Sequence, residues 1–220
     1  MTKLSHSIGS LAKLLPAAIV LAFAAGTATA DDKGQQQEKM KQQEAVKVDA
    51  NSFKCITEMT AVRHFYVDNL RGDVAGTVAV AKAGRGDYPE GSVIQLVPTE
   101  AMVKQQKGFN PATRDWEFFA LDVDKDSTKI YQRGYEDVNN RFGLNCFTCH
   151  QAAQADFDFV CEQEHGCAPI PVTRAMFGAL QRTDPRCKIQ NPVTEEDKQA
   201  LKELEQVVKA LKTTVEPGNK

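Results

Sequence analysis

The most constraining feature of this 220-residue chain is the pentapeptide Cys146-Phe147-Thr148-Cys149-His150. C-x-x-C-H is the attachment sequence of a c-type haem. Two thiols three positions apart point the same way on a tight helical turn, where each can add to one vinyl group of a porphyrin. The histidine that follows supplies the proximal nitrogen ligand of the iron. We therefore expect one covalent haem c per chain, attached through Cys146 and Cys149, with His150 on the iron.

Two other chemistries use a C-x-x-C pair, and the sequence favours neither. A thioredoxin-type redox motif needs no trailing histidine and usually follows the first strand of a βαβ unit, a pattern that we do not find before the motif. A structural zinc site needs a second C-x-x-C or an H-x-H partner, and the sequence contains neither.

Residues 1–30 have the organisation of a secretory signal peptide. Lys3 and Lys13 precede an apolar run, and Ala28-Thr29-Ala30 is an A-x-A cleavage site. The apolar run is too short for a permanent membrane span, and no cysteine follows the cleavage site to carry a lipid. We therefore expect a periplasmic protein, cleaved after Ala30, with no membrane anchor; a retained N-terminal anchor helix is the alternative.

The remaining chain is long enough for one domain with a full hydrophobic core. We expect a polar linker over residues 31–50, a haem domain over 51–190 that ends in a disulfide-rich extension, and a C-terminal helix with a tail over 191–220. The net charge of −2 and the pI of about 6.1 give no indication of a nucleic-acid partner.

Four cysteines remain once the motif is set aside: Cys55, Cys161, Cys167 and Cys187. In an oxidising compartment they imply two disulfides, with three connectivities open. Cys161 and Cys167 are close enough for a local bridge, which would leave Cys55 to pair with Cys187; crossed pairings stay open. The alternative is a metal site built from Cys161, His165, Cys167 and Cys187, since Cys-x3-His-x-Cys has plausible ligand spacing. Export favours the disulfides.

The pattern between residues 51 and 124 is typical of β-strands. Turn residues separate four candidate strands: His64–Asp68, Ala75–Ala81, Ser92–Val97 and Asp115–Asp124. In the last of these, Trp116, Phe118 and Ala120 face one side, whereas Phe119, Leu121 and Val123 face the other. Such a strand is central and covered on both faces. Short connections favour an antiparallel meander, and the more helical C-terminal third makes the fold class α+β.

The chain ends in a predicted amphipathic helix that begins after Thr194. Thr194 is a suitable N-cap with Asp197 three residues later. The apolar stripe consists of Leu201, Leu204, Val208 and Leu211. This stripe is expected to pack on the domain or on a second copy of the chain, in a homodimer.

Three segments, in this order, resemble the cytochrome P-460 and cytochrome c′-beta family of periplasmic haem proteins. They are Tyr88–Ile94, Asp115–Phe119, and the C-x-x-C-H motif with the run that ends in Asp158-Phe159-Val160. In ordinary small cytochromes c the motif lies near the mature N-terminus of an all-helical fold, whereas here a β-rich region precedes it. The resemblance covers residues 62–160 and implies a haem pocket built on an antiparallel sheet.

Leu96 marks a departure within this resemblance. The hydroxylamine-oxidising members carry a lysine two positions after the apolar pair of G-x-V-I, and it forms an additional covalent link to the porphyrin. Here Gly91–Ile94 is followed by Gln95 and Leu96, and the next lysine is Lys104. The resemblance therefore implies a c′-beta-like protein whose distal side is lined by Leu96 and by Phe118 or Phe119. An apolar pocket without a hydrogen-bond donor admits small neutral ligands such as nitric oxide or carbon monoxide.

Three functions remain candidates. The first is a five-coordinate haem protein that binds nitric oxide or a related small nitrogen species, and the second is a hydroxylamine-oxidising enzyme. The third is a six-coordinate electron carrier that serves a periplasmic redox partner. The absence of a lysine at position 96 weighs against the enzyme. The β-rich region that precedes the motif weighs against the electron carrier. Candidate sixth ligands are Met102, Met176, His64 and His165, and candidate partners of the haem propionates are Arg114, Arg133 and Arg141.

Overall fold

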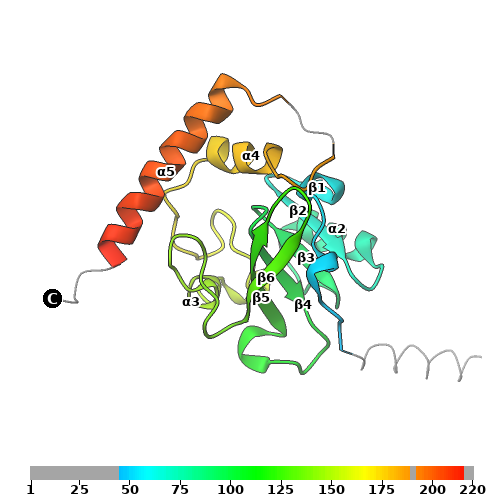
Figure 1. Cartoon of the computed structure of the whole chain (residues 1–220). Coiled ribbons are helices and arrows are strands. Elements are labelled where there is room, and N and C mark those ends of the chain that lie inside the picture. Colours follow the sequence, from blue (N-terminus) through cyan, green and yellow to red (C-terminus); the bar gives the residue numbers. More distant parts are fainter. Residues whose placement is uncertain (1–44, 189–191, 216–220) are drawn as a thin grey trace, which may run out of the picture. The chain divides into compact units, whose positions relative to one another are not determined.

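The computed structural model describes residues 45–188 and 192–215 (Figure 1). The expected signal peptide and most of the expected linker lie outside these residues. Within them, no helix combines the length and the apolar character that crossing a bilayer requires.

Six strands in the described part of the chain form one sheet, and each strand pairs antiparallel with its neighbour in sequence. This order confirms the predicted meander, and the helices beside the sheet confirm the α+β class. The strands are β1 (Thr60–Val62), β2 (Phe65–Asn69), β3 (Ser92–Gln95), β4 (Glu100–Lys104), β5 (Trp116–Val123) and β6 (Thr128–Gly134). The helices are α2 (Val74–Ala83), α3 (Cys146–His150), α4 (Arg174–Arg182) and α5 (Glu195–Val215).

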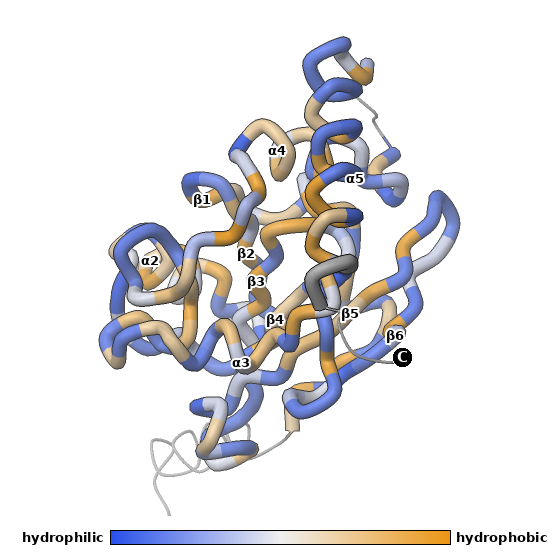
Figure 2. Tube along the Cα trace, turned by 90° about the vertical axis from the view of Figure 1, so that its left-hand side faces the viewer, coloured by the Kyte–Doolittle hydropathy of each residue, from blue (hydrophilic) through white to orange (hydrophobic). Residues whose placement is uncertain are grey.

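Strand β5 divides its side chains between two hydrophobic clusters, as its alternation predicts. Trp116, Phe118 and Ala120 belong to the first cluster, which also contains residues of β2, β3, β4 and α2. Phe119, Leu121 and Val123 belong to the second cluster, on the other face of the sheet. Figure 2 shows hydrophobic residues along the central strands and hydrophilic residues at many of the turns between them.

The stretch predicted as a strand at Ala75–Ala81 is a helix, so that prediction was wrong. Asp73 caps α2 by accepting a hydrogen bond from the Gly76 amide, and Gly84 ends the helix in the left-handed conformation with φ 68°. Between these caps the alanines favour a helix more strongly than the valines oppose it. Thr77 of α2 is fully buried and hydrogen-bonds to Asn69 and Ser92 of the sheet.

The second cluster is covered by the segment that precedes β1. Val46 and Val48 are 7% and 9% exposed and pack in this cluster, so the last residues of the segment expected to be a polar linker are part of the domain. Phe53 follows, with its ring centroid 5.1 Å from that of Phe119. The short 3₁₀ turns of this segment are η1 (Ala50–Ser52) and η2 (Ile56–Glu58).

Two disulfides close the fold. Cys55 is bonded to Cys187 and Cys161 to Cys167, with S–S distances of 2.01 and 1.97 Å. The local bridge and the long-range bridge are therefore both confirmed. The alternative metal site is wrong because its three thiols are used in these bonds, and His165 Nδ1 instead donates to the Val160 carbonyl at 2.6 Å.

Helices α4 and α5 pack against each other in a third cluster (Figure 1). Thr194 caps α5 as predicted, since its hydroxyl accepts from the Asp197 amide at 3.1 Å while the Asp197 carboxylate accepts from the Thr194 amide at 3.2 Å. Leu201, Leu204 and Val208 of the predicted stripe lie in this cluster. The stripe therefore packs on the chain's own domain.

Candidate functional site

The motif occupies α3, a helical turn fixed by the residue that precedes it. The Asn145 side chain accepts a hydrogen bond from the Thr148 amide at 2.8 Å and so caps the turn. The side-chain Nδ2 of Asn145 donates to the Glu136 carbonyl at 2.7 Å, and the backbone amide of Cys146 donates to the Val138 carbonyl at 2.9 Å. These bonds attach the start of α3 to the loop that follows β6.

Cys146 and Cys149 are the two cysteines of the chain that form no disulfide. Both are partly buried. Burial raises the pKa of Cys146 to about 12, and the Glu100 carboxylate contributes to this shift. Burial also raises the pKa of Cys149. A raised pKa favours the protonated thiol over the thiolate at neutral pH in both residues.

His150 is oriented by a backbone carbonyl. Its Nδ1 lies 2.6 Å from the Phe159 carbonyl oxygen, and because a carbonyl only accepts, Nδ1 carries the proton. Burial lowers the pKa of His150 and so favours the neutral imidazole. The tautomer leaves a lone pair on Nε2, which is the arrangement that a metal-ligating histidine adopts.

Aromatic and aliphatic side chains surround the motif. The Phe118 ring lies 5.2 Å from the His150 ring and 6.4 Å from the Phe147 ring, and the Phe147 ring lies 5.9 Å from that of Phe159. Leu96, Cys146, Phe147 and Phe159 are partly buried residues packed against the first cluster. The structure therefore brings two of the predicted lining residues, Leu96 and Phe118, to the side of the sheet on which the motif lies.

Phe119 does not belong to this group, so of the two alternatives at this strand the structure brings Phe118 to the side of the motif. It is fully buried in the second cluster, because successive residues of a strand point to opposite faces. Arg133 lies on the same face of the sheet as Phe119. Its guanidinium lies 5.1 Å from the Phe119 ring centroid and pairs with Glu117. Arg133 therefore lies away from the motif as well.

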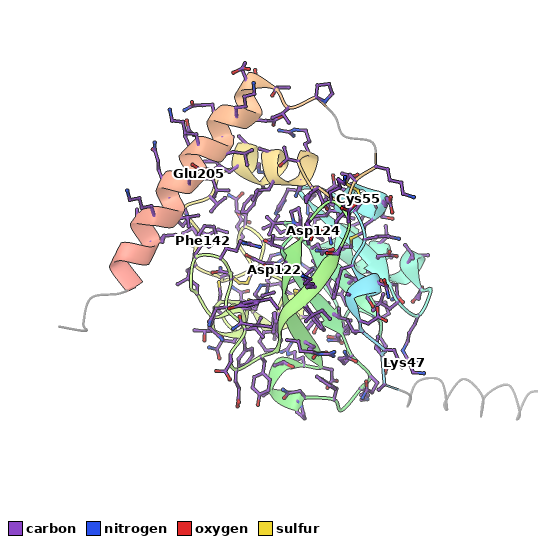
Figure 3. All side chains as sticks on the ribbon, in the orientation of Figure 1. Lys47, Cys55, Asp122, Asp124, Phe142 and Glu205 are labelled. Carbon is purple, nitrogen blue, oxygen red and sulfur yellow. A yellow bond between two sulfur atoms is a disulfide. The ribbon has the colours of Figure 1, made fainter. Side chains whose placement is uncertain are left out.

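The other predicted residues are distributed around the fold. Met102 packs in the first cluster, whereas Met176 packs between α4 and α5. His64 lies in the turn between β1 and β2, and its buried Nδ1 has no hydrogen-bond partner among the described residues. Arg114 lies 5.4 Å from the Phe159 ring, and Arg141 pairs with Asp122 at 3.3 Å. The loop before α3 also reaches α5 through Phe142 (Figure 3).

Sequence reasoning missed a carboxyl group beside the motif. Glu100 of β4 acts electrostatically on Cys146, and burial raises the pKa of Glu100 itself. The Arg141 amide donates to it at a long distance of 3.5 Å. The surroundings of the motif are therefore not wholly apolar. No local pattern marks Glu100, since it stands 46 positions before Cys146 and only strand pairing brings it near.

The chain was also compared with known protein families, curated proteins and solved structures. No protein-family model, curated protein or solved structure matches the chain.

Proposed function

We propose that this chain is an exported c-type cytochrome that binds nitric oxide or a related small nitrogen species at a five-coordinate haem. Cys146 and Cys149 would hold the porphyrin through thioether bonds, and His150 would bind the iron through Nε2. When bound, the haem supplies an iron with an open sixth position for a small neutral ligand.

The observation that carries this proposal is the contrast among the six cysteines. Four are consumed in disulfides, whereas the two of the motif stay reduced on a single helical turn. The histidine that follows them has its Nδ1 proton fixed by the Phe159 carbonyl. Two thiols and a neutral imidazole whose Nε2 carries the lone pair, next to the aromatic rings of Phe118 and Phe147, fit the donor set of a haem c.

The surrounding residues favour ligand binding over hydroxylamine oxidation. Leu96 carries no amine. Lys104, the next lysine in the chain, is held in a buried ion pair with Asp158 at 2.7 Å, and so neither residue is available to cross-link the porphyrin. Leu96 and Phe118 offer no hydrogen-bond donor that would hold an anionic ligand. The chain is therefore expected to bind nitric oxide and carbon monoxide and to oxidise hydroxylamine slowly or not at all.

One observation keeps an electron carrier as the second candidate. Met102 is buried in the cluster against which Cys146 packs, and a thioether on that side is a known type of sixth ligand in electron-transfer cytochromes. Such a protein would be low-spin and indifferent to nitric oxide.

Optical spectra of the purified ferrous protein, with and without nitric oxide, separate these functions. We expect a high-spin spectrum that changes on addition of nitric oxide or carbon monoxide. A low-spin spectrum unchanged by nitric oxide would support the electron carrier, and Met102→Leu would then identify the ligand. The double variant Cys146→Ala/Cys149→Ala is the control, since it removes the attachment and should contain no covalent haem.

Export is part of the same proposal. Haem attachment through two thioethers and the formation of two disulfides both suit an oxidising compartment such as the bacterial periplasm. The predicted cleavage after Ala30 is tested by the N-terminal sequence and mass of the protein recovered from the periplasmic fraction.

A further inference from the structure

We propose that a buried ion pair, Lys104–Asp158, positions the iron-ligating histidine by fixing the backbone turn that presents the Phe159 carbonyl to His150. This inference rests on the proposed haem function only for its effect on the iron. The two residues are positioning residues, because neither would touch the haem or its ligand.

The ion pair is short and enclosed. Lys104 Nζ lies 2.7 and 2.8 Å from the two carboxylate oxygens of Asp158 and donates a further bond to the Arg114 carbonyl at 2.7 Å. The Asp158 side chain has no exposed surface. Lys104 also lies 5.1 Å from the ring centroid of Trp116, which is itself fully buried. With Lys104 only 11% exposed, these bonds are largely shielded from water.

Asp158 is held from other elements as well. Its Oδ2 accepts from the Tyr88 amide at 2.9 Å, and its backbone carbonyl accepts from the indole Nε1 of Trp116 at 2.7 Å. The residue is thus attached to β4 by Lys104, to β5 by Trp116, and to the segment before β3 by Tyr88. Three parts of the sheet region converge on one residue.

The turn that these bonds fix is unfavourable by itself. Asp158 and Phe159 both have positive φ, 45° and 63°, although neither is glycine. Side chains with a Cβ rarely adopt this region, and two such residues in succession persist only where the surroundings hold them. Asp158 is one of the residue types that tolerate the conformation, whereas Phe159 is not. The Phe159 carbonyl that accepts from His150 is therefore placed by the bonds at Asp158.

The remainder of the loop has its own supports. The Phe157 and His165 rings are stacked with their centroids 3.8 Å apart. The Cys161–Cys167 disulfide closes the short loop that contains His165. Removal of the ion pair leaves Asp158 held only by Tyr88 and Trp116, and is therefore expected to loosen the turn at 158–159 while leaving the loop folded. Because a buried ion pair often adds little net stability compared with apolar residues, a role in orientation also explains its presence.

The consequence for the iron follows from the chemistry of imidazole. A hydrogen bond from Nδ1 to a carbonyl fixes the ring orientation and raises the basicity of the nitrogen that binds the metal. Loss of the bond would weaken donation from Nε2. The iron–histidine stretching frequency should fall, and the reduction potential should rise because the ferric form loses more stabilisation than the ferrous form.

The test is the double variant Lys104→Met/Asp158→Asn, which removes both charges and leaves no unpaired one. Asparagine keeps the size of Asp158 and tolerates positive φ. Arg133→Met/Glu117→Gln is the control, because that pair also joins charged residues in the sheet, at 2.7 Å, but packs on the opposite face, with Arg133 46% exposed. Lys104→Arg, which keeps the charge, should recover part of the wild-type behaviour.

Resonance Raman spectra and redox titrations of the haem-loaded full chain give the first readout. We expect a lower, broader iron–histidine band and a higher potential in the Lys104→Met/Asp158→Asn variant, and wild-type values in the control. Wild-type values in a folded, haem-loaded variant would overturn the inference, as would an equal shift in the control.

A second readout does not need the haem. In ¹⁵N-edited spectra of the full chain, the His150 Nδ1 proton should exchange slowly in wild type and in the control, and rapidly in the variant. If the wild type proves to hold no haem, the proposed function fails while this readout still decides the inference. Fast exchange in the wild type, or slow exchange in the variant, would contradict it.

Discussion

The two faces of the sheet differ in which segments of the chain cover them. Phe119, on one face, is fully buried under Phe53 and its neighbours. Phe118, on the other face, is also buried, and the partly buried residues packed against its cluster include Leu96 and two members of the motif, Cys146 and Phe147. Of these two adjacent residues of β5, Phe119 thus packs in a core without the motif, whereas Phe118 packs beside the motif. The face against which the C-x-x-C-H turn packs is the one on which our proposal places the haem.

The pair Phe118→Ala and Phe119→Ala tests this difference most strongly. Each substitution deletes a buried ring and should lower the free energy of unfolding by about 3–5 kcal/mol. Only Phe118→Ala should also change the haem spectrum and the affinity for carbon monoxide. Chemical denaturation measures the first effect and ligand titration the second. An altered spectrum in Phe119→Ala, with none in Phe118→Ala, would reverse our assignment of the two faces.

The disulfides provide the next largest effect. Cys55→Ala/Cys187→Ala should lower the free energy of unfolding by about 2–5 kcal/mol, because this bridge closes a long loop between the cover of the second cluster and the segment after α4. Cys161→Ala/Cys167→Ala should cost less stability, since its loop is short, but should disturb the loop that carries Phe159. The matching check on the wild type is thiol titration of the haem-loaded, denatured protein without reductant, where any reactive thiol would contradict the account.

Leu96→Lys tests the chemistry of the face on which Phe118 and the motif lie, with a smaller expected loss of stability. The side chain is partly exposed, so the loss of stability should be about 1 kcal/mol. An amine at this position is expected to link to the porphyrin and to change the absorption spectrum, whereas Leu96→Met, which has no amine, should leave it unchanged. Hydroxylamine turnover by the unmodified protein would show that the missing lysine does not limit its chemistry.

The smallest effect concerns the α4–α5 pair, which belongs to neither face. Hydrogen bonds from Arg182 and from the Thr194 amide lower the pKa of Asp197 to about 2. A carboxyl group with a depressed pKa stabilises the fold above its unfolded value near 3.8, and this contribution is lost as pH falls toward 2. Asp197→Asn should therefore be less stable than wild type at pH 6, and the difference should shrink below pH 4. Denaturation midpoints at both pH values measure it, with no change expected in the haem spectrum.

The sequence predicted the parts of the fold that depend on local patterns. The alternation in Asp115–Asp124 placed the six apolar side chains of β5 on their correct faces, and the Thr194 cap located the start of α5. Ala75–Ala81 was misassigned because small and β-branched residues suit both states, and the caps at Asp73 and Gly84 decided for a helix. Strands β1, β4 and β6 were not predicted, since their stability comes from pairing with neighbours.

The part of the candidate site that forms a continuous sequence motif could be recognised from the sequence. The pentapeptide identified Cys146, Cys149 and His150, and proximity suggested the Cys161–Cys167 bridge. The residues that orient the site were not predictable, because Lys104 and Asp158 are 54 positions apart and meet only through the folded sheet. Glu100 reaches the motif in the same way. Long-range contacts between single polar residues leave no periodic signal in a sequence.

The most direct test of the central claim is whether haem stays with the polypeptide through denaturation and acid-acetone extraction. The account predicts that the purified wild-type chain keeps one haem, detected by the mass of the denatured protein and by its pyridine haemochrome spectrum. Cys146→Ala/Cys149→Ala should lose it under the same conditions. Haem that extracts freely from the wild type, or a chain matured in a haem-attaching host that carries none, would contradict the account.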